Sequence, residues 1–101
     1  PKPSSAASDV YKRQLYTRGG DGMTAYAHGH RIEQPAFAVA VADTVGAGDA
    51  CIGGFLASRL LRPDADLAEH VRFAAATAAA ACTRAGAHAP SRAEVERVLA
   101  L

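Results

Sequence analysis

Cysteine is scarce in this sequence of 101 residues: only Cys51 and Cys82 occur, and their spacing matches no C-x-x-C motif. Such a pair argues against a disulfide framework or a zinc site and favours a reducing cytoplasm. The net charge is only +1, and aromatic residues make up 6%. Without a basic stripe, a nucleic-acid surface is not expected. The alanine-rich run from Phe73 to Cys82 is well short of the roughly 20 apolar residues that cross a bilayer, so no membrane partner is expected either.

The first 14 residues carry Pro, Ser, Ala and charge without helical or strand periodicity. They resemble translated vector sequence, and we expect a non-native or disordered segment over residues 1–14. The remaining residues, 15–101, are expected to form one globular unit. This division leaves a single unit of ordinary size for the fold.

Short strands followed by helices are expected in this unit. The glycine loops and the alternation of apolar residues predict strands at residues 15–18, 23–27 and 31–33. After Pro35, the residues Phe37, Val39 and Val41 alternate with alanines, which predicts a further, partly buried strand.

Two of the three expected helices begin at capping boxes. In the first, Asp66 accepts from the first-turn N–H groups and Glu69 reaches back, and the helix should end near Ala85 because Gly86 suits the position after a helix. The second begins with Ser91-Arg92-Ala93-Glu94. Together with the strands, these helices predict an α/β layer.

The segment 41–50 joins the alternating run to the remaining helix, which should end near Leu61. Its two glycines and the free N–H groups of a helix start suit an anion such as phosphate. Asp49 stands where a carboxylate could take a proton from an attacking hydroxyl, and Asp43 stands where a second carboxylate could serve a cation. A lone G-x-G-D is weak evidence, because most such turns bind nothing.

Three motifs in the sequence, one of them this loop, together resemble those of a known family. Residues 43–49, Asp-Thr-Val-Gly-Ala-Gly-Asp, resemble the D-T-x-G-A-G-D signature of the PfkB, or ribokinase-like, carbohydrate kinases. Residues 17–22 resemble the family's T-x-G-x-x-G loop, and residues 83–87 resemble its T-R-x-G-A segment. The resemblance covers residues 15–101 and implies the C-terminal portion of a ribokinase-like three-layer α/β sandwich.

The resemblance implies an ATP-dependent kinase that phosphorylates a hydroxymethyl group of a sugar. Asp49 would be the catalytic base, ionised at neutral pH because an aspartate has a pKa of about 3.9. Gly46, Ala47 and Gly48 would donate N–H groups to the transferring phosphoryl group.

The resemblance also implies where ATP binds. Thr17 and Gly19 would contact the phosphates, with Gly22 allowing the chain to turn. Ala75 and the turn that includes Gly86 would lie beside the adenine, because small residues leave room for a base.

Many family members hold a monovalent cation beside the anion hole, which implies K⁺ here. The matching positions are Asp43, Val45, Arg84 and Gly86. Ser91 lies one residue from the serine that often completes this site, so the match is incomplete. Mg²⁺ would arrive with ATP rather than in a protein cage.

Two departures qualify the resemblance. The family usually has phenylalanine two residues after the catalytic aspartate, where this sequence has Cys51, a substitution that a core tolerates. Family members are also about three times longer, and the missing part holds the sugar pocket. We therefore expect the polypeptide alone to be inactive as a kinase.

The motif variants are most similar to those of fructokinases among the sugar kinases, although ketodeoxygluconate and ribose kinases share them. A nucleoside kinase of the same fold, a non-catalytic nucleotide-binding remnant and an unrelated oxyanion-binding domain are the alternatives, although the intact Asp49 disfavours a remnant. A homodimeric parent protein is compatible with the resemblance.

Overall fold

The computed structural model describes residues 13–17, 22–27, 29–86 and 88–101. Three strands precede three helices: β1 (Arg13–Thr17), β2 (Met23–Ala27), β3 (His30–Gln34), α2 (Ala47–Leu61), α3 (Leu67–Cys82) and α4 (Arg92–Leu99). This order confirms the α/β class and the sequence of short strands followed by helices.

The strands form one antiparallel sheet in the order β1-β2-β3. Its first strand begins two residues before the expected domain start at Leu15, because Arg13 pairs with Ala27 and Gln14 pairs with Tyr26. The last two residues of the segment 1–14 therefore belong to the sheet, whereas residues 1–12 lie outside the described part of the chain.

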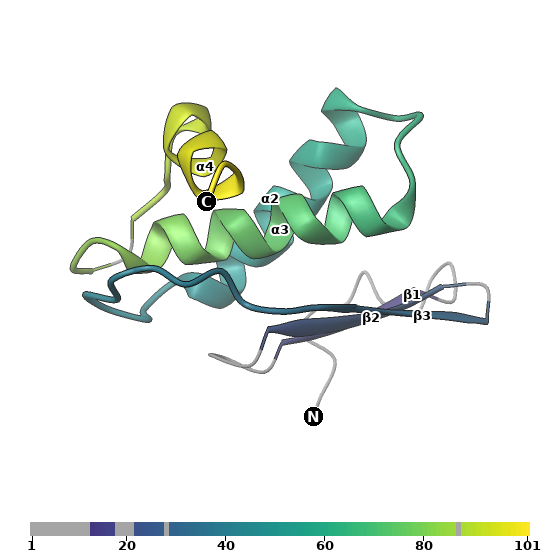
Figure 1. Cartoon of the computed structure of the whole chain (residues 1–101), viewed down its shortest axis with the longest axis horizontal. Coiled ribbons are helices and arrows are strands. Elements are labelled where there is room, and N and C mark those ends of the chain that lie inside the picture. The colour runs from purple at the N-terminus through teal and green to yellow at the C-terminus, as the bar shows by residue number, and fades with distance from the viewer. Residues whose placement is uncertain (1–12, 18–21, 28, 87) are drawn as a thin grey trace.

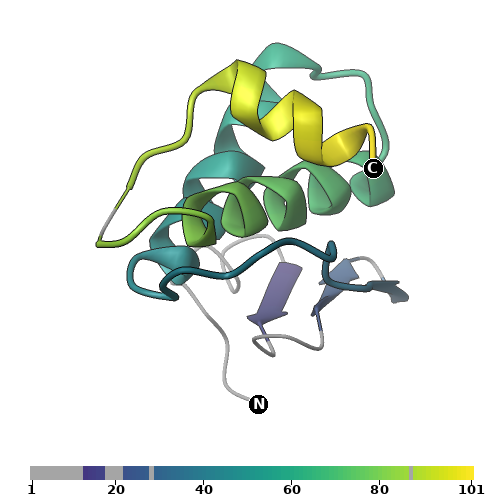
Figure 2. The ribbon, with the colours of Figure 1, turned by 60° about the vertical axis from the view of Figure 1, so that its left-hand side comes forward.

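Helix α3 lies between the sheet and α4, and α2 crosses behind α3 (Figures 1 and 2). On the sheet side, Val71 and Ala74 are fully buried with Met23 of β2 and Phe55 of α2. On the α4 side, a second cluster buries four residues, Ala76, Ala80, Val95 and Val98. The alanines of α3 keep both neighbours close to its backbone, so this helix is the centre of the fold.

Close packing between α2 and α3 depends on a glycine. A Cβ atom at Gly54 would lie 2.5 Å from Oγ1 and 2.7 Å from Cβ of Thr77, so only glycine fits there. One turn further along α2, the hydroxyl of Ser58 and Nδ1 of His70 are hydrogen-bonded at 2.8 Å, and both side chains are buried. None of the described helices is long and apolar enough to cross a membrane.

The prediction of a strand around Phe37, Val39 and Val41 is wrong. Residues 35–41 are extended without strand pairing, and no described strand lies alongside to complete a ladder. The alternation of apolar residues still has a cause, because Phe37 and Val39 pack against the α3–α4 cluster while Ala38 between them is exposed. Packing against helices thus produced a period of two without a sheet.

The expected end of α3 near Ala85 is also wrong, since the helix ends at Cys82. The carbonyl of Cys82 accepts N–H groups from residues 42 and 43 instead of continuing the helix, and the Thr83 hydroxyl donates to the carbonyl of Ala80. At the other end, the Asp66 side chain accepts from the N–H of Glu69 as expected. Glu69 itself forms an ion pair with Arg62 at 3.8 Å.

At α4 the capping box is complete, as the sequence predicts. The Ser91 hydroxyl accepts the N–H of Glu94, and the Glu94 carboxylate accepts the N–H of Ser91.

Candidate functional site

The loop before α2 is fastened to the turn after α3. The N–H groups of Ala42 and Asp43 both donate to the carbonyl of Cys82, at 2.8 and 3.2 Å. The Asp43 carboxylate then accepts the N–H of Val45 at 3.0 Å through Oδ1 and the N–H of Gly86 at 2.9 Å through Oδ2. One carboxylate therefore joins two loops that are 43 residues apart in the sequence.

The residues predicted around a monovalent cation are brought together at this junction. The hydrogen bond from Gly86, followed by that from Val45, lowers the pKa of Asp43, so its charged form is favoured. Each Asp43 oxygen accepts one of these bonds, which leaves lone pairs on both oxygens for a further partner. Arg84 lies in the same turn, but its guanidinium pairs with Glu94 at 3.2 Å. Its carbonyl, rather than its side chain, is therefore the group to consider as a cation ligand.

The N-terminus of α2 has backbone N–H donors that lack an acceptor among the described residues. Gly46 precedes the helix with φ at 81°, in the left-handed region, and no side chain caps the first turn. Ala47 donates to the carbonyl of Thr44, but no acceptor among the described residues binds the N–H groups of Gly48 and Asp49. Because α3 and α4 do have side-chain caps, this is the helix start at which an anion meets free donors.

The carboxylate of Asp49 is exposed in the first turn of α2 and has no partner within the described ranges. It lines a groove together with Gly46, His88 and Pro90. An unpaired carboxylate beside free N–H donors can accept a proton from a hydroxyl group next to a bound anion.

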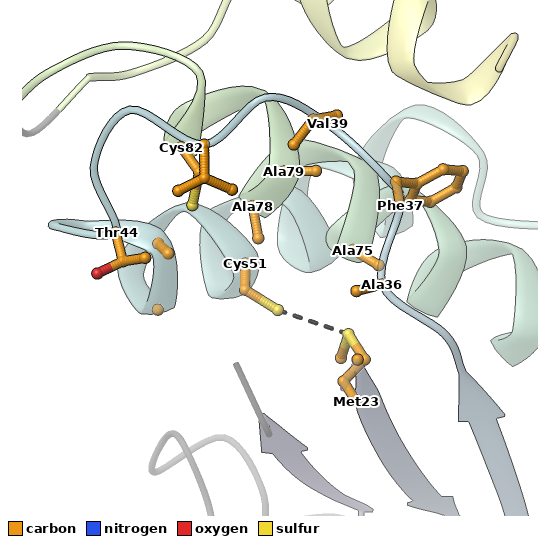
Figure 3. Close-up of a pocket in the computed structure, with 14 residues that line it drawn as sticks. Met23, Ala36, Phe37, Val39, Thr44, Cys51, Ala75, Ala78, Ala79 and Cys82 are labelled. Atoms are coloured by element: carbon orange, nitrogen blue, oxygen red, sulfur yellow. Dashed lines mark hydrogen bonds between the residues drawn. The ribbon is translucent and has the colours of Figure 1, made fainter. Parts of the chain in front are cut away.

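A cleft of about 350 Å³ opens on the other side of this first turn (Figure 3). The small-residue face of α3 lines it, together with the extended segment that begins at residue 36 and runs beside α3. The residues that line it are Gly22, Met23, Ala36, Phe37, Val39, Val41, Thr44, Ala47, Gly48, Cys51, Ala75, Ala78, Ala79 and Cys82.

Four residues predicted from the sequence meet on this cleft: Gly22, Ala47, Gly48 and Ala75. Only Gly22 has a clear packing reason to be glycine, because its φ is 98° and a Cβ there would lie 2.9 Å from Cα of Pro35. At Gly48 an added Cβ would meet nothing within 4 Å.

The other predicted nucleotide contacts are Thr17, Gly19 and Gly86, and Gly86 is not among the residues that line the cleft. Gly86 has φ at 77° and takes part through its bond to Asp43. The backbone of Thr17 ends β1, and Gly19 lies outside the described residues.

Both cysteines line the cleft, which the sequence did not indicate. They are free thiols, and burial raises the pKa of Cys51 to about 11. Cys51 donates a weak hydrogen bond to Sδ of Met23 at 3.6 Å, so it packs as a core residue, as expected for this substitution (Figure 3). The sequence did contain a signal for the position of Cys82: residues 75, 78, 79 and 82 are spaced to share one helix face, so Cys82 lies on the same face as Ala75. In the part of the chain that the structure describes, no three metal-ligating side chains are grouped.

Comparison with known proteins agrees with this geometry. The family model described as "pfkB family carbohydrate kinase" matches residues 5–94. The chain belongs to the pfkB family of carbohydrate kinases. A 2-dehydro-3-deoxygalactonokinase from Haloferax volcanii is 40% identical over 98 residues, which is 95% of this chain and 30% of that protein. The chain thus spans about a third of the curated relative that it matches.

Solved structures show the same relationship. A ribokinase from Arabidopsis thaliana, complexed with ribose and ATP, has a TM-score of 0.80 and 31% identity over 89% of this chain and 30% of its own. Phosphofructokinase-2 from Escherichia coli, in complex with potassium, has a TM-score of 0.78 and 29% identity over 88% of this chain and 28% of its own. Nucleoside kinases are also among the matched structures. These likenesses confirm the ribokinase-like fold.

Proposed function

We propose that this chain is the nucleotide-binding part of an ATP-dependent kinase that phosphorylates a hydroxyl group of a sugar or a related small molecule. The observation that carries the proposal is a single cleft that extends from an apolar wall of α3 to the first turn of α2. An adenine ring needs an apolar surface, and a triphosphate needs donors beside it. This cleft offers both.

The wall of α3 suits the base because its side chains are short. Ala75, Ala78 and Ala79 line the cleft, and Val39 of the neighbouring segment lies beside Ala79 (Figure 3). Gly48 lines the same cleft, and its N–H group has no acceptor among the described residues. The positive end of the α2 dipole adds to the attraction for phosphate. The adenine therefore lies toward Ala75 and the terminal phosphate toward Gly48.

Catalysis of phosphoryl transfer depends on positioning and charge stabilisation more than on covalent chemistry. The N–H groups of Gly48 and Asp49 stabilise the negative charge on the transferring group. The Asp49 carboxylate accepts the proton of the acceptor hydroxyl as the new oxygen–phosphorus bond forms. Both roles use groups that are unpaired within the described part of the chain.

Two kinds of cation accompany the proposal. Mg²⁺ enters with ATP and neutralises phosphate charge, as in other kinases. K⁺ is held at Asp43, which retains acceptor capacity beyond its bonds to Val45 and Gly86. Carbonyl groups of the turn at Arg84 would complete that site.

The acceptor is proposed as a class. The matched relatives include kinases of a keto-deoxy sugar acid, ribose and nucleosides, so fructose stays a prediction and a nucleoside stays the alternative. This chain spans 30% of that sugar-acid kinase, and we place the acceptor pocket in the part that it does not span.

Cys82 provides a test, because it lines the cleft and is 9% exposed. We expect ATP with Mg²⁺ to slow alkylation of Cys82 by iodoacetamide, measured by peptide mass spectrometry. Sodium chloride at the same ionic strength should leave the rate unchanged. An alkylation rate unaffected by millimolar ATP would contradict a nucleotide in this cleft.

A further inference from the structure

The Glu94 carboxylate, at the start of α4, holds the turn between α3 and α4 at two points. Its Oε2 lies 3.2 Å from Nη2 of Arg84 and 3.3 Å from Nε2 of His88. Its Oε1 accepts the N–H of Ser91 at 2.8 Å. The Glu94 side chain is only 15% exposed, so these contacts are partly shielded from water. The Glu94 carboxylate therefore contacts Arg84 and His88, which lie on either side of Gly86 in the sequence.

Gly86 lies between these two points. Its N–H donates to Oδ2 of Asp43 at 2.9 Å, and the N–H of Asp43 donates to the carbonyl of Cys82. Asp43 in turn accepts the N–H of Val45, directly before the left-handed residue that opens α2. The contacts of Glu94 with the turn, the short backbone link from Arg84 to Gly86 and the hydrogen bonds of Asp43 therefore connect α4 to the loop that orients the first turn of α2.

We infer that Glu94 is a positioning residue for the phosphate-binding end of the cleft. By holding Arg84 and His88, it keeps Gly86 within reach of Asp43, and Asp43 keeps the N–H groups of the first turn of α2 aimed at the phosphates. The inference rests on the proposed function, because it assigns a purpose to contacts around that same site.

Helix capping alone does not account for Glu94. A capping box needs only the exchange of bonds between Ser91 and Glu94, and glutamine serves at this position as well as glutamate. The contacts with Arg84 and His88 are additional, and the one with Arg84 depends on the negative charge. The pKa of Glu94 is lowered to about 2, first by the N–H of Ser91 and then by His88, the Ser91 hydroxyl and Arg84. Glu94 is therefore charged at neutral pH.

The variant Glu94→Gln separates the two roles, because it retains the cap and removes the charge. Glu96→Gln is the matched control, since Glu96 lies on the same helix, pairs with Arg92 at 3.0 Å and does not contact the turn. Amide hydrogen exchange at Gly86 measures the link to Asp43. The dissociation constants of ATP and adenosine then separate phosphate binding from base binding, which a general loss of structure would not separate.

For Glu94→Gln we expect faster exchange at Gly86 and an ATP affinity about fivefold weaker, with adenosine affinity unchanged. Glu96→Gln should match the unmodified chain in all three measurements. Unchanged exchange at Gly86 together with an unchanged ratio of ATP to adenosine affinity would overturn the inference, and so would equal weakening of both ligands. If the unmodified chain binds no ATP, the proposed function fails, while the exchange at Gly86 still decides the link.

Discussion

Glycine suits positions 22, 54 and 48 for different physical reasons. A Cβ at Gly22 would press into the backbone at Pro35, and a Cβ at Gly54 would press into Thr77. At Gly48 a Cβ would meet nothing, although glycine inside a helix costs about 0.5–1 kcal/mol relative to alanine. Approach of a phosphate to the backbone supplies a reason for Gly48 that packing does not.

The substitution Gly48→Ala should therefore uncouple stability from binding. We expect the free energy of unfolding to rise by about 0.5–1 kcal/mol, because alanine favours the helix. ATP affinity should fall, since the new methyl group enters the cleft that Gly48 lines. Urea unfolding and calorimetric ATP titration measure the two effects, and undiminished ATP affinity would argue against phosphate binding here.

Acid should weaken the fold through Glu94. Its pKa is about 2 in the folded chain against an ordinary 4.5, so the ionised form stabilises the fold. That contribution is complete above about pH 4.5 and is lost as the pH falls toward 2. Urea unfolding at several pH values should show a smaller loss for Glu94→Gln than for the unmodified chain. If both proteins lost the same free energy of unfolding as the pH falls, the contacts of the Glu94 carboxylate would not stabilise the fold.

The sequence predicted several individual site residues but not the network that joins them. The family resemblance assigned Gly22, Ala47, Gly48 and Ala75 to one nucleotide site, and these residues line one cleft. The role of Glu94 could not be predicted, because its contacts with Arg84 and His88 depend on how the turn folds back over α4.

At the level of elements, Gly53 and Gly54 provide a matched pair in the middle of α2. A Cβ at Gly54 would clash with Thr77, whereas a Cβ at Gly53 would meet nothing within 4 Å. We expect Gly54→Ala to lower the free energy of unfolding by about 1–3 kcal/mol, and Gly53→Ala to raise it by about 0.5–1 kcal/mol. Thermal unfolding compares them, and equal effects would contradict the packing of α2 on α3.

Helix starts were easier to predict than helix ends and strands. A cap is a local matter of one side chain and the next turn, so Asp66 and Ser91 behave as predicted. The end of α3 depends on residues 42 and 43, which bind the carbonyl of Cys82 from far along the sequence. A strand likewise needs a partner, and the alternation over residues 37–41 carries no information about one.

At the scale of the whole molecule, this chain spans about a third of its matched relatives. Large apolar side chains are exposed on it, including Leu60 at 83% and Val41 at 61%. We expect no sugar-dependent ATP turnover from the chain by itself, because we place the acceptor pocket outside the part of the relatives that the chain spans. A coupled assay with a panel of sugars checks this, and turnover with any of them would show that the chain contains a complete active site.

The most direct test of the central proposal is an ATP–Mg²⁺ titration of the isotopically labelled chain, followed by the amide resonances of α2 and α3. The account predicts saturable shifts at Gly48 and Asp49, where the phosphates bind, and at Ala75 and Ala78, where the base lies. Adenosine should shift only the two alanines. Saturable shifts confined to other parts of the chain, or none at millimolar ATP, would contradict it.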